Sequence, residues 1–309
     1  MNRRTLAAAL LLLLAVPGAA LAAAKAAHAP GPAPTPAPVL KVGVTLHPYY
    51  SWAKSVVGDT PVEVRAILPD DVDSGNYQPS PGDIKKLADL DAIVVNGVGH
   101  DDFIFDMIKA SGNTKIVLIK PNDGLPLLKA KNGGVTNAHT FISFTNAIQG
   151  TWTIEKALAG MKPELAPAFE ENAAAYARKL RTMKAAAATK LADAKINRVI
   201  TVHDGYGYLM QEFGIDIAAV VEPSHGITPS AAELQQIVEI ANKQNVHVVF
   251  AEESFPKPML DSLKESAHAK VYVISHIEGG GYTAETFEKA MQENVDSMIR
   301  ALVTDPGRT

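Results

Sequence analysis

Two stretches of the chain share one pattern, in which short apolar runs alternate with amphipathic segments. The apolar runs lie at residues 39–46, 62–68, 92–97 and 115–120, and again at 198–203, 217–222, 246–253 and 270–275. Runs of this length predict buried strands, and the segments between them predict helices at 51–58, 80–90 and 101–112, and at 205–213, 230–243 and 256–267. Strands that alternate with helices favour parallel sheets with right-handed crossovers. We therefore expect an α/β fold of two lobes, each with a parallel sheet flanked by helices.

The segment between the two stretches is rich in helix-forming residues. Residues 163–194 contain many Ala, Glu, Lys, Arg and Leu residues, which favour a long helix. About 30 helical residues extend roughly 45 Å, so this helix would join the lobes rigidly. Two shorter helices with a break near Pro167 are the alternative. The last segment, 283–304, predicts an amphipathic helix with a buried stripe made of Phe287, Met291, Val295, Met298 and Leu302.

The first 39 residues differ in composition from the rest. Arg3 and Arg4 precede an apolar run over residues 6–16, and Ala20-Leu21-Ala22 follow it, which is the pattern of a secretory signal peptide. The run is shorter than the roughly 20 residues that a membrane span needs, which disfavours an uncleaved anchor. The expected location is the periplasm. We expect a signal peptide at 1–23, an Ala/Pro-rich disordered tether at 24–39, an N-terminal lobe at 40–162, a linking helix at 163–195 and a C-terminal lobe at 196–309.

Composition excludes several kinds of chemistry. The chain of 309 residues has no Cys, so it has no disulfide, no thiolate metal site and no Cys nucleophile. It carries 29 Lys and Arg residues against 33 Asp and Glu residues, a mixture that argues against nucleic-acid binding. A functional site must therefore rely on His, carboxylate or hydroxyl groups.

Four of the nine histidines stand at the ends of predicted strands or just ahead of a helix, namely His47, His139, His203 and His276. A single His in such a place is more often structural than a metal ligand. Ligands of α/β proteins, however, bind beyond the carboxyl ends of the strands, so four such residues on two facing lobes would point into one cleft. Imidazoles in the absence of Cys suit Zn²⁺, Cu²⁺ or Ni²⁺ better than Mg²⁺ or Ca²⁺.

Six segments in the mature chain have sequences typical of one known family. They lie at 67–87, 94–103, 137–148, 201–215, 222–234 and 248–255, and the most specific sequences are SPGDIKKLADLDAIVVNG and HDGYGY. On these segments, which keep the family order through about residues 40–305, the chain resembles the metal-binding solute receptors of ABC importers, in their zinc and manganese cluster. The resemblance implies two α/β lobes bridged by a long rigid helix, with a metal ion bound between them.

The resemblance implies metal ligands at only some of the family's positions. It implies that His139 and His203 bind metal, because each lies in a matching motif. The family's first ligand is a His, and the matching residue here is Gly75. The family's carboxylate ligand falls at Ser275, which has His276 beside it.

We hypothesise that His47 replaces the ligand missing at Gly75 and that His276 replaces the missing carboxylate. The expected metal site is then His47, His139, His203 and His276. Neutral imidazoles leave the charge of a divalent ion uncompensated, so nearby carboxylates are expected to help. The candidates for that role are Asp73, Glu222 and Glu253, and the reserve candidates for metal contact are His100 and His225.

The expected cargo is Zn²⁺, with Mn²⁺ or another divalent ion as the alternative. Many zinc receptors of the family carry a long acidic, His-rich loop ahead of the second ligand, and residues 122–138 form a plain segment in its place. That absence weakens the case for zinc, whereas the predominance of imidazole over carboxylate strengthens it, because manganese favours oxygen ligands. The resemblance implies a monomer whose partner is the permease of an ABC metal importer.

Three other functions stay open at this point. A receptor for a different ion or a metal chelate would use the space left by Gly75, and a periplasmic metal chaperone would have the same site as an import receptor. A zinc hydrolase would need a general base, for which Asp204, Glu222 and Glu253 are candidates. The sequence has no nucleophile elbow, phosphate-binding loop or dinucleotide fingerprint, so we expect a receptor and not an enzyme.

Overall fold

The computed structural model describes residues 40–131, 136–222 and 226–305, and all of these belong to one compact unit. The expected signal peptide at 1–23 and tether at 24–39 lie outside these ranges, and so does His225. In the described ranges no helix combines the length and the apolar character that crossing a membrane requires.

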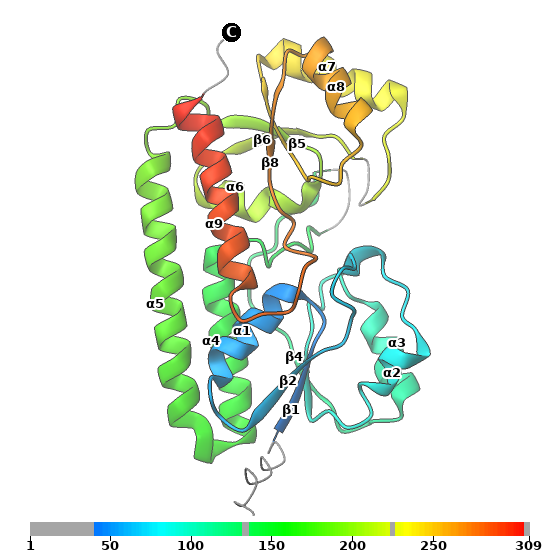
Figure 1. Ribbon diagram of the computed structural model, residues 1–309, viewed down its shortest axis with the longest axis vertical. Helices are drawn as coiled ribbons and strands as arrows, with labels where there is room; N and C mark the ends of the chain where they lie inside the picture. The colour runs from blue at the N-terminus through cyan, green and yellow to red at the C-terminus, as the bar shows by residue number, and fades with distance from the viewer. Residues whose placement is uncertain (1–39, 132–135, 223–225, 306–309) are drawn as a thin grey trace, which may run out of the picture. The chain divides into compact units, whose positions relative to one another are not determined.

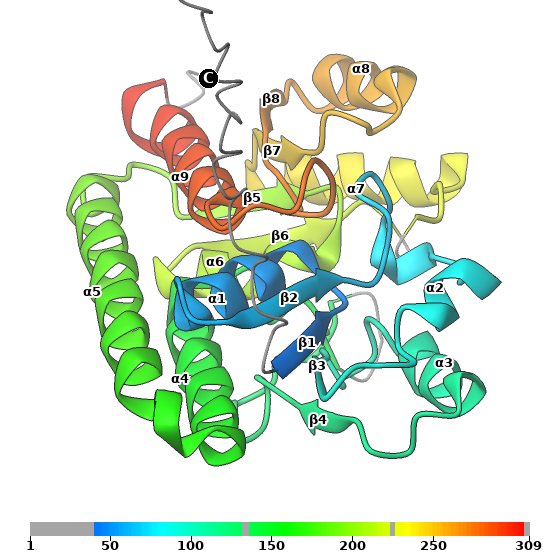
Figure 2. The same ribbon diagram turned by 60° about the horizontal axis from the view of Figure 1, so that its bottom comes forward.

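The N-terminal lobe is built on a parallel sheet of four strands, in the order β2-β1-β3-β4. The strands are β1 (Leu40–Val44), β2 (Val62–Ala66), β3 (Ala92–Val94) and β4 (Val117–Ile119). Helix α1 (His47–Val57) packs on one face, and α2 (Pro81–Lys85) and α3 (Phe103–Ser111) pack on the other (Figure 2). Because helices cover both faces, β3 is buried along its whole length, as a strand in a parallel sheet should be.

The C-terminal lobe repeats this arrangement with the sheet order β6-β5-β7-β8, again parallel throughout. Its strands are β5 (Arg198–Thr201), β6 (Asp216–Val220), β7 (Val248–Ala251) and β8 (Lys270–Val273). Its helices are α6 (Gly207–Glu212), α7 (Ala231–Gln244) and α8 (Lys257–Ser266). The two sheets confirm the expected α/β class, and each predicted strand is present with shorter bounds.

Local sequence signals explain where several helices begin. The side chain of Ser80 accepts a hydrogen bond from the backbone of Asp83, whose carboxylate accepts one from the backbone of Ser80, and Pro81 occupies the first turn of α2. The same reciprocal cap, between Ser230 and Glu233, begins α7. Such capping boxes satisfy backbone N–H groups that have no partner inside the helix.

Two long helices, α4 (Phe144–Met161) and α5 (Ala166–Leu191), lie side by side, α4 beside the N-terminal lobe and α5 along both lobes (Figure 1). Helix α4 leads through a 3₁₀ turn (Pro163–Leu165) into α5, which has 26 residues. Pro167 lies in the first turn of α5, where a missing N–H is tolerated, so the helix is not broken there. The expected long helix between the lobes is confirmed, with its first predicted turn in 3₁₀ form.

The last helix runs from the N-terminal lobe, where its first turn contacts α1, back to the C-terminal lobe. Helix α9 (Thr286–Ile299), followed by a π-helical turn (Arg300–Thr304), packs against α1 and α5. The whole predicted apolar stripe from Phe287 to Leu302 is buried, which confirms its assignment to the core. In that core the ring centroid of Phe287 lies 5.5 Å from that of Trp52 of α1. One apolar cluster therefore continues through both lobes and holds them together.

Candidate metal centre

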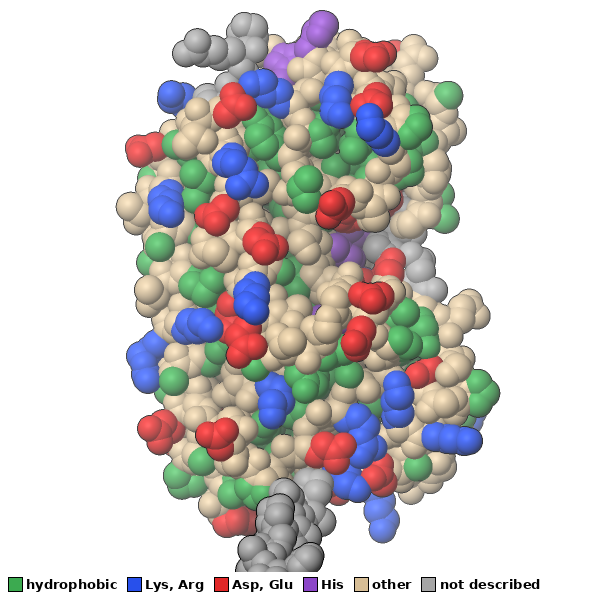
Figure 3. Space-filling view, viewed as in Figure 1, with side chains coloured by type: hydrophobic (Ala, Val, Ile, Leu, Met, Phe, Trp, Pro, Cys, Tyr) green, Lys and Arg blue, Asp and Glu red, His purple; other side chains and the backbone are tan. Residues whose placement is uncertain are grey.

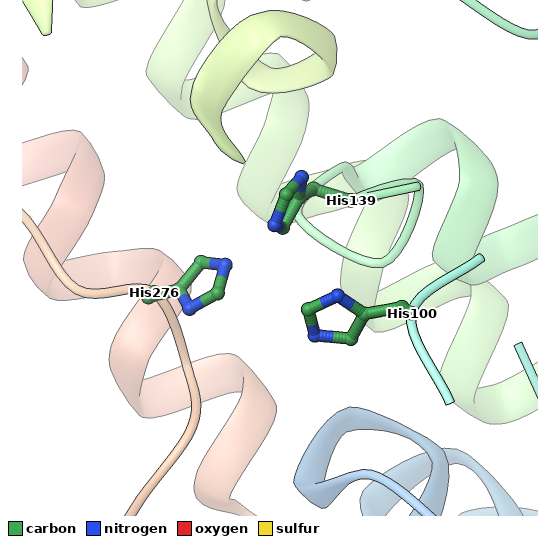
Figure 4. A group of neighbouring side chains, drawn as sticks. All are labelled: His100, His139 and His276. Carbon is green, nitrogen blue, oxygen red and sulfur yellow. The ribbon is translucent and has the colours of Figure 1, made fainter. Parts of the chain in front are cut away.

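Four histidine rings meet between the lobes. The ring centroid of His139 lies 4.9 Å from that of His100, 4.6 Å from that of His203 and 4.8 Å from that of His276. The centroids of His203 and His276 are 4.7 Å apart. Figure 4 shows that His100, His139 and His276 point toward a common centre from three separate segments, and one nitrogen from each ring lies within 4.8 Å of the others. The four rings form what we call the histidine cluster.

His100 is held by the turn that follows β3. The buried carboxylate of Asp101 accepts hydrogen bonds from two backbone N–H groups of this turn, at 2.7 and 3.1 Å, and from Thr45 Oγ1 at 2.5 Å. Burial raises the pKa of Asp101, and the hydrogen bonds oppose that change because they stabilise the ionised form. The network fixes His100, whose Nε2 lies 2.5 Å from Glu278 Oε1.

His139 lies ahead of α4 and is oriented by Asn137. The amide Nδ2 of Asn137 donates to the carbonyl oxygen of Asp204 at 2.6 Å, and its Oδ1 accepts from the backbone N–H of His139 at 3.0 Å. The same Oδ1 lies 3.0 Å from Nδ1 of His139. Because Oδ1 can only accept, Nδ1 is the protonated nitrogen and Nε2 carries a lone pair.

His203 follows β5 directly and is oriented by a carboxylate. Its Nδ1 lies 3.2 Å from Glu222 Oε2, so Nδ1 donates and Nε2 again carries a lone pair. The two Nε2 atoms of His139 and His203 face each other at 2.9 Å. When both rings are neutral, two lone pairs meet at this distance, and a cation placed between them stabilises the arrangement.

His276 follows β8 and begins a loop, residues 276–283, that crosses to the N-terminal lobe; we call it the crossing loop. Glu278 Oε1 accepts from Ser74 Oγ at 2.6 Å, and the backbone N–H of Gly280 donates to Asp71 Oδ1 at 2.9 Å. Ile277 is buried with φ at 62°, a conformation that β-branched residues rarely adopt. Strain of this kind, of order 1–3 kcal/mol, persists only where surrounding contacts hold it, and here it turns His276 toward the cluster and Glu278 toward the N-terminal lobe.

Gly205 leaves room for two of the rings. A Cβ atom at this position would lie 2.8 Å from His203 Cδ2 and 2.9 Å from His276 Cδ2, closer than real Cβ contacts come. The glycine in the HDGYGY sequence is therefore required for His203 and His276 to approach each other.

The structure places His47 outside the histidine cluster. Its Nε2 lies 2.8 Å from the carbonyl oxygen of Asp70 and 2.9 Å from that of Gly280, and its ring stacks on Tyr282 with centroids 3.9 Å apart. Since both carbonyls accept, Nε2 carries the proton. Burial lowers the pKa of His47, although the two carbonyls oppose the change. Of the four residues expected from the sequence, His139, His203 and His276 come together and His47 joins the lobes instead.

Two residues of the centre have weak signals in the sequence. His100, a reserve candidate, follows a strand as His203 and His276 do, so the strand-end rule points to it as well as to His47. Glu278 was not indicated, because its position depends on the turn at Ile277. Gly75 is exposed, beside the buried Ser74 that contacts Glu278.

Two parallel sheets joined by a long helix, with a buried histidine cluster between them, define a two-lobed binding protein with the ligand chemistry of a metal site. Residues 42–301 match the family described as "Zinc-uptake complex component A periplasmic", ZnuA. The chain therefore belongs to the ZnuA family.

Individual relatives support the family assignment. The zinc-binding lipoprotein AdcA of Streptococcus pneumoniae (strain ATCC BAA-255 / R6) is 25% identical over 276 residues, which are 84% of this chain and 55% of AdcA, so the chain spans about half of that relative. The high-affinity zinc uptake system protein ZnuA of Bacillus subtilis (strain 168) is 24% identical over 283 residues, covering 85% of this chain and 88% of that protein.

Solved structures show the same fold. The solute-binding protein FpvC of Pseudomonas aeruginosa in complex with Mn²⁺ has a TM-score of 0.80 and 40% identity, and the match covers 85% of this chain and 98% of FpvC. The structure of FpvC in complex with Ni²⁺ also has a TM-score of 0.80 and 40% identity, over 87% of this chain and 98% of FpvC.

Proposed function

We propose that this protein is a periplasmic receptor that binds one divalent metal ion between its lobes and delivers it to the permease of an ABC importer. The proposed ligands are His100, His139, His203 and His276. This set keeps three of the residues that the sequence indicated and takes His100 in place of His47, because the Nε2 proton of His47 is shared between two carbonyls.

The observation that carries the proposal is the pair of facing Nε2 atoms of His139 and His203, 2.9 Å apart. Asn137 and Glu222 hold the Nδ1 protons of these rings, so both lone pairs are aimed at the same point. A carboxylate or amide that binds the far nitrogen of a metal-ligating His is the usual way in which proteins orient such a ring. Zn–N bonds of about 2.0–2.1 Å in a tetrahedral site set the nitrogens about 3.3 Å apart, a modest adjustment from the observed spacing.

Charge balance comes from carboxylates next to the rings. Glu278 lies 2.5 Å from His100 and 3.5 Å from His276, and Glu222 lies 3.2 Å from His203. Two carboxylates offset the charge of one divalent cation among neutral imidazoles.

The proposed cargo is Zn²⁺, in keeping with the predominance of imidazole donors. A second candidate is a receptor for Mn²⁺ or Ni²⁺. It is favoured by the similarity to FpvC, whose complexes contain these ions, and by Glu278, whose oxygens suit a harder ion.

The contacts of the candidate general bases favour a receptor over a zinc hydrolase. Glu222 is engaged by His203, and Asp204 accepts a hydrogen bond from the backbone of Lys131 at 2.8 Å. Burial raises the pKa of Asp204. A hydrolase also needs an open metal position for water, whereas four imidazoles complete a tetrahedral shell. A metal chaperone would have the same shell and would differ only in its partner.

The proposal includes the division of the chain expected from the sequence. Residues 1–23 form a cleaved signal peptide, 24–39 a tether, 40–162 and 196–309 the lobes, and 163–195 the linking helix. Because one apolar core crosses both lobes, we expect metal release to involve the loops of the centre more than a hinge between lobes.

Calorimetric titration of the purified, chelator-stripped protein with ZnCl₂, MnCl₂ and NiCl₂ tests the function. We expect about one ion per chain, and a loss of affinity of more than about 100-fold in His139→Ala and His203→Ala. His268→Asn is the matched control, since His268 is exposed and its φ of 50° suits Asn.

Two results would change the interpretation. If none of the three ions saturates the protein near one per chain, the receptor proposal is wrong. If only MnCl₂ or NiCl₂ binds tightly, the receptor stands and its cargo is not zinc.

A further inference from the structure

An acidic cavity of about 420 Å³ adjoins the histidine cluster. His276 forms part of its wall, and the surrounding residues come from the ends of β7 and β8, from α9 and from the loop that precedes η1 (Ser74–Asn76) of the N-terminal lobe. Five carboxylates line it, and no Lys or Arg is among the described residues that do so. They are Asp73, Glu252, Glu253, Glu278 and Glu293.

The cavity connects solvent with the cluster. Glu253 and Glu293 are exposed, whereas the side chain of Glu278 is only 2% exposed. Figure 3 shows histidine atoms between the lobes with Asp and Glu side chains on both sides of them. The carboxylates therefore extend from the protein surface to the rings.

A set of possible metal donors lies where the cavity meets the cluster. One carboxylate oxygen of Asp73, one ring nitrogen of His100 and one oxygen of Glu278 lie within 4.8 Å of one another. The Oε2 atom of Glu278 is buried and accepts no hydrogen bond from the described residues; its ion-pair contact is His276 Nδ1, at 3.5 Å. A buried carboxylate oxygen in this condition carries a desolvation penalty that a cation relieves. His100 belongs both to this set and to the histidine cluster, so a cation at Asp73 and Glu278 is already in contact with one of the proposed ligands.

We propose that this cavity is the route by which divalent cations reach and leave the histidine cluster, with Asp73, His100 and Glu278 as a transfer point on the way. The inference rests on the proposed function. A cleft lined by one sign of charge between low-dielectric walls concentrates ions of the opposite sign and raises their association rate. Oxygen donors at the transfer point replace part of the hydration shell before the imidazoles bind the ion.

Stopped-flow measurement of Zn²⁺ association, followed by a chelator chase for dissociation, tests the route. In Glu253→Gln/Glu293→Gln, neither residue being a proposed ligand, we expect the association rate constant at low ionic strength to fall by about 3–10-fold. The difference should shrink at about 1 M salt, because screening removes the attraction of the cavity. The matched control is Glu239→Gln/Glu265→Gln, which changes the net charge equally at exposed positions of α7 and α8.

A second variant tests the passage itself. Ser254 is exposed and lines the cavity, so Ser254→Trp places bulk in the route at a residue that is not a proposed ligand. We expect association and dissociation to slow together, with the equilibrium affinity within about threefold of the parent protein, because a barrier on the route changes both rates equally.

The proposal is overturned if the Glu253 and Glu293 variant associates as fast as the parent, or slows no more than its control. It is also overturned if Ser254→Trp leaves both rates unchanged. These outcomes leave the receptor function intact, because they require a parent protein that binds Zn²⁺. A parent protein that binds no ion at equilibrium would instead contradict the proposed function itself.

Discussion

The two lobes share one strand order, yet the histidines that end their first strands have different contacts. His203 follows β5 and enters the cluster, whereas His47 follows β1 and bonds two carbonyl oxygens. The difference begins with the residues that come next. Pro48 continues directly into the long helix α1, while Gly205 allows a tight 3₁₀ turn against the rings. A His at the end of a strand thus lies at the carboxyl edge of the sheet, and the residues that follow it determine the direction in which its ring points.

The other strand ends differ between the lobes as well. The third strand of the N-terminal lobe leads to His100, and that of the C-terminal lobe leads to Glu252 and Glu253 of the acidic cavity. The fourth strands lead to Asn122, which donates to a backbone carbonyl, and to His276. Each lobe supplies two rings to the cluster, from positions that do not correspond. The two lobes are therefore similar in backbone fold, whereas their functional side chains differ and both lobes are needed to form the cluster.

The largest expected effect separates the two histidines at equivalent strand ends. His203→Ala should weaken metal binding by more than about 100-fold, because it removes a proposed ligand. His47→Ala should change affinity by less than tenfold and lower the free energy of unfolding by about 1–3 kcal/mol, because the buried ring of His47 and its hydrogen bonds to two carbonyl oxygens are lost. Metal titration and urea unfolding of both variants measure this contrast. Equal losses of affinity would restore His47 to the metal site.

The next effect concerns Glu278, the carboxylate of the crossing loop that contacts Ser74 and His100 of the N-terminal lobe. Glu278→Gln should reduce metal affinity by about 10–100-fold, since it removes a charge next to His100 and His276. Glu285→Gln, at an exposed position shortly after the crossing loop, is the control and should bind as the parent does. Competition titration against a chelator of known affinity measures both. An unchanged Glu278→Gln variant would mean that charge compensation comes from elsewhere.

A smaller effect is expected from the glycine that distinguishes the β5 strand end. Gly205→Ala should weaken metal binding by about tenfold or more, because a Cβ atom would displace His203 and His276. Gly160→Ala, in α4 with open space around it, is the control and should raise the free energy of unfolding by about 0.5–1 kcal/mol. Titration and thermal unfolding measure the two variants. A Gly205→Ala variant with parental affinity would show that the two rings can move apart without a loss of binding free energy.

The smallest effect is a pH dependence of stability that belongs to His47. Its pKa in the folded protein is lowered by burial below the ordinary value of 6.5, so the unfolded chain binds the proton first as the pH falls through that value. Stability is then lost on acidification. His47→Gln keeps an N–H donor without titrating, so the metal-free variant should lose less stability than the parent between about pH 7.5 and about pH 5.5. Urea unfolding at both pH values measures the difference, and identical losses would contradict the assignment.

Much of the fold was predictable, because its elements are encoded locally. Seven of the eight strands of the two sheets fall within apolar runs read from the sequence, and β6 begins one residue before its run. The caps at Ser80 and Ser230 mark helix starts by side-chain chemistry alone. The long helix followed from its Ala-rich composition. The crossing loop was not predictable, because the residues after Ile277 are held by contacts with residues about 200 positions earlier: Glu278 with Ser74, and Gly280 with Asp71.

The sequence by itself determined the class of fold, the absence of thiol chemistry and the importance of histidines at strand ends. It favoured His47 as a ligand and kept His100 in reserve, although both follow strands of the same sheet. Only the tertiary structure brings His100, and not His47, beside the other rings. Ring orientation depends on hydrogen-bond partners far away in the chain: Asp70 and Gly280 for His47, and Glu278 for His100. Local sequence sets the backbone conformation through short-range sterics and capping. A metal centre, in contrast, needs side chains from distant segments to lie close together, and only the packing of the two lobes brings them there.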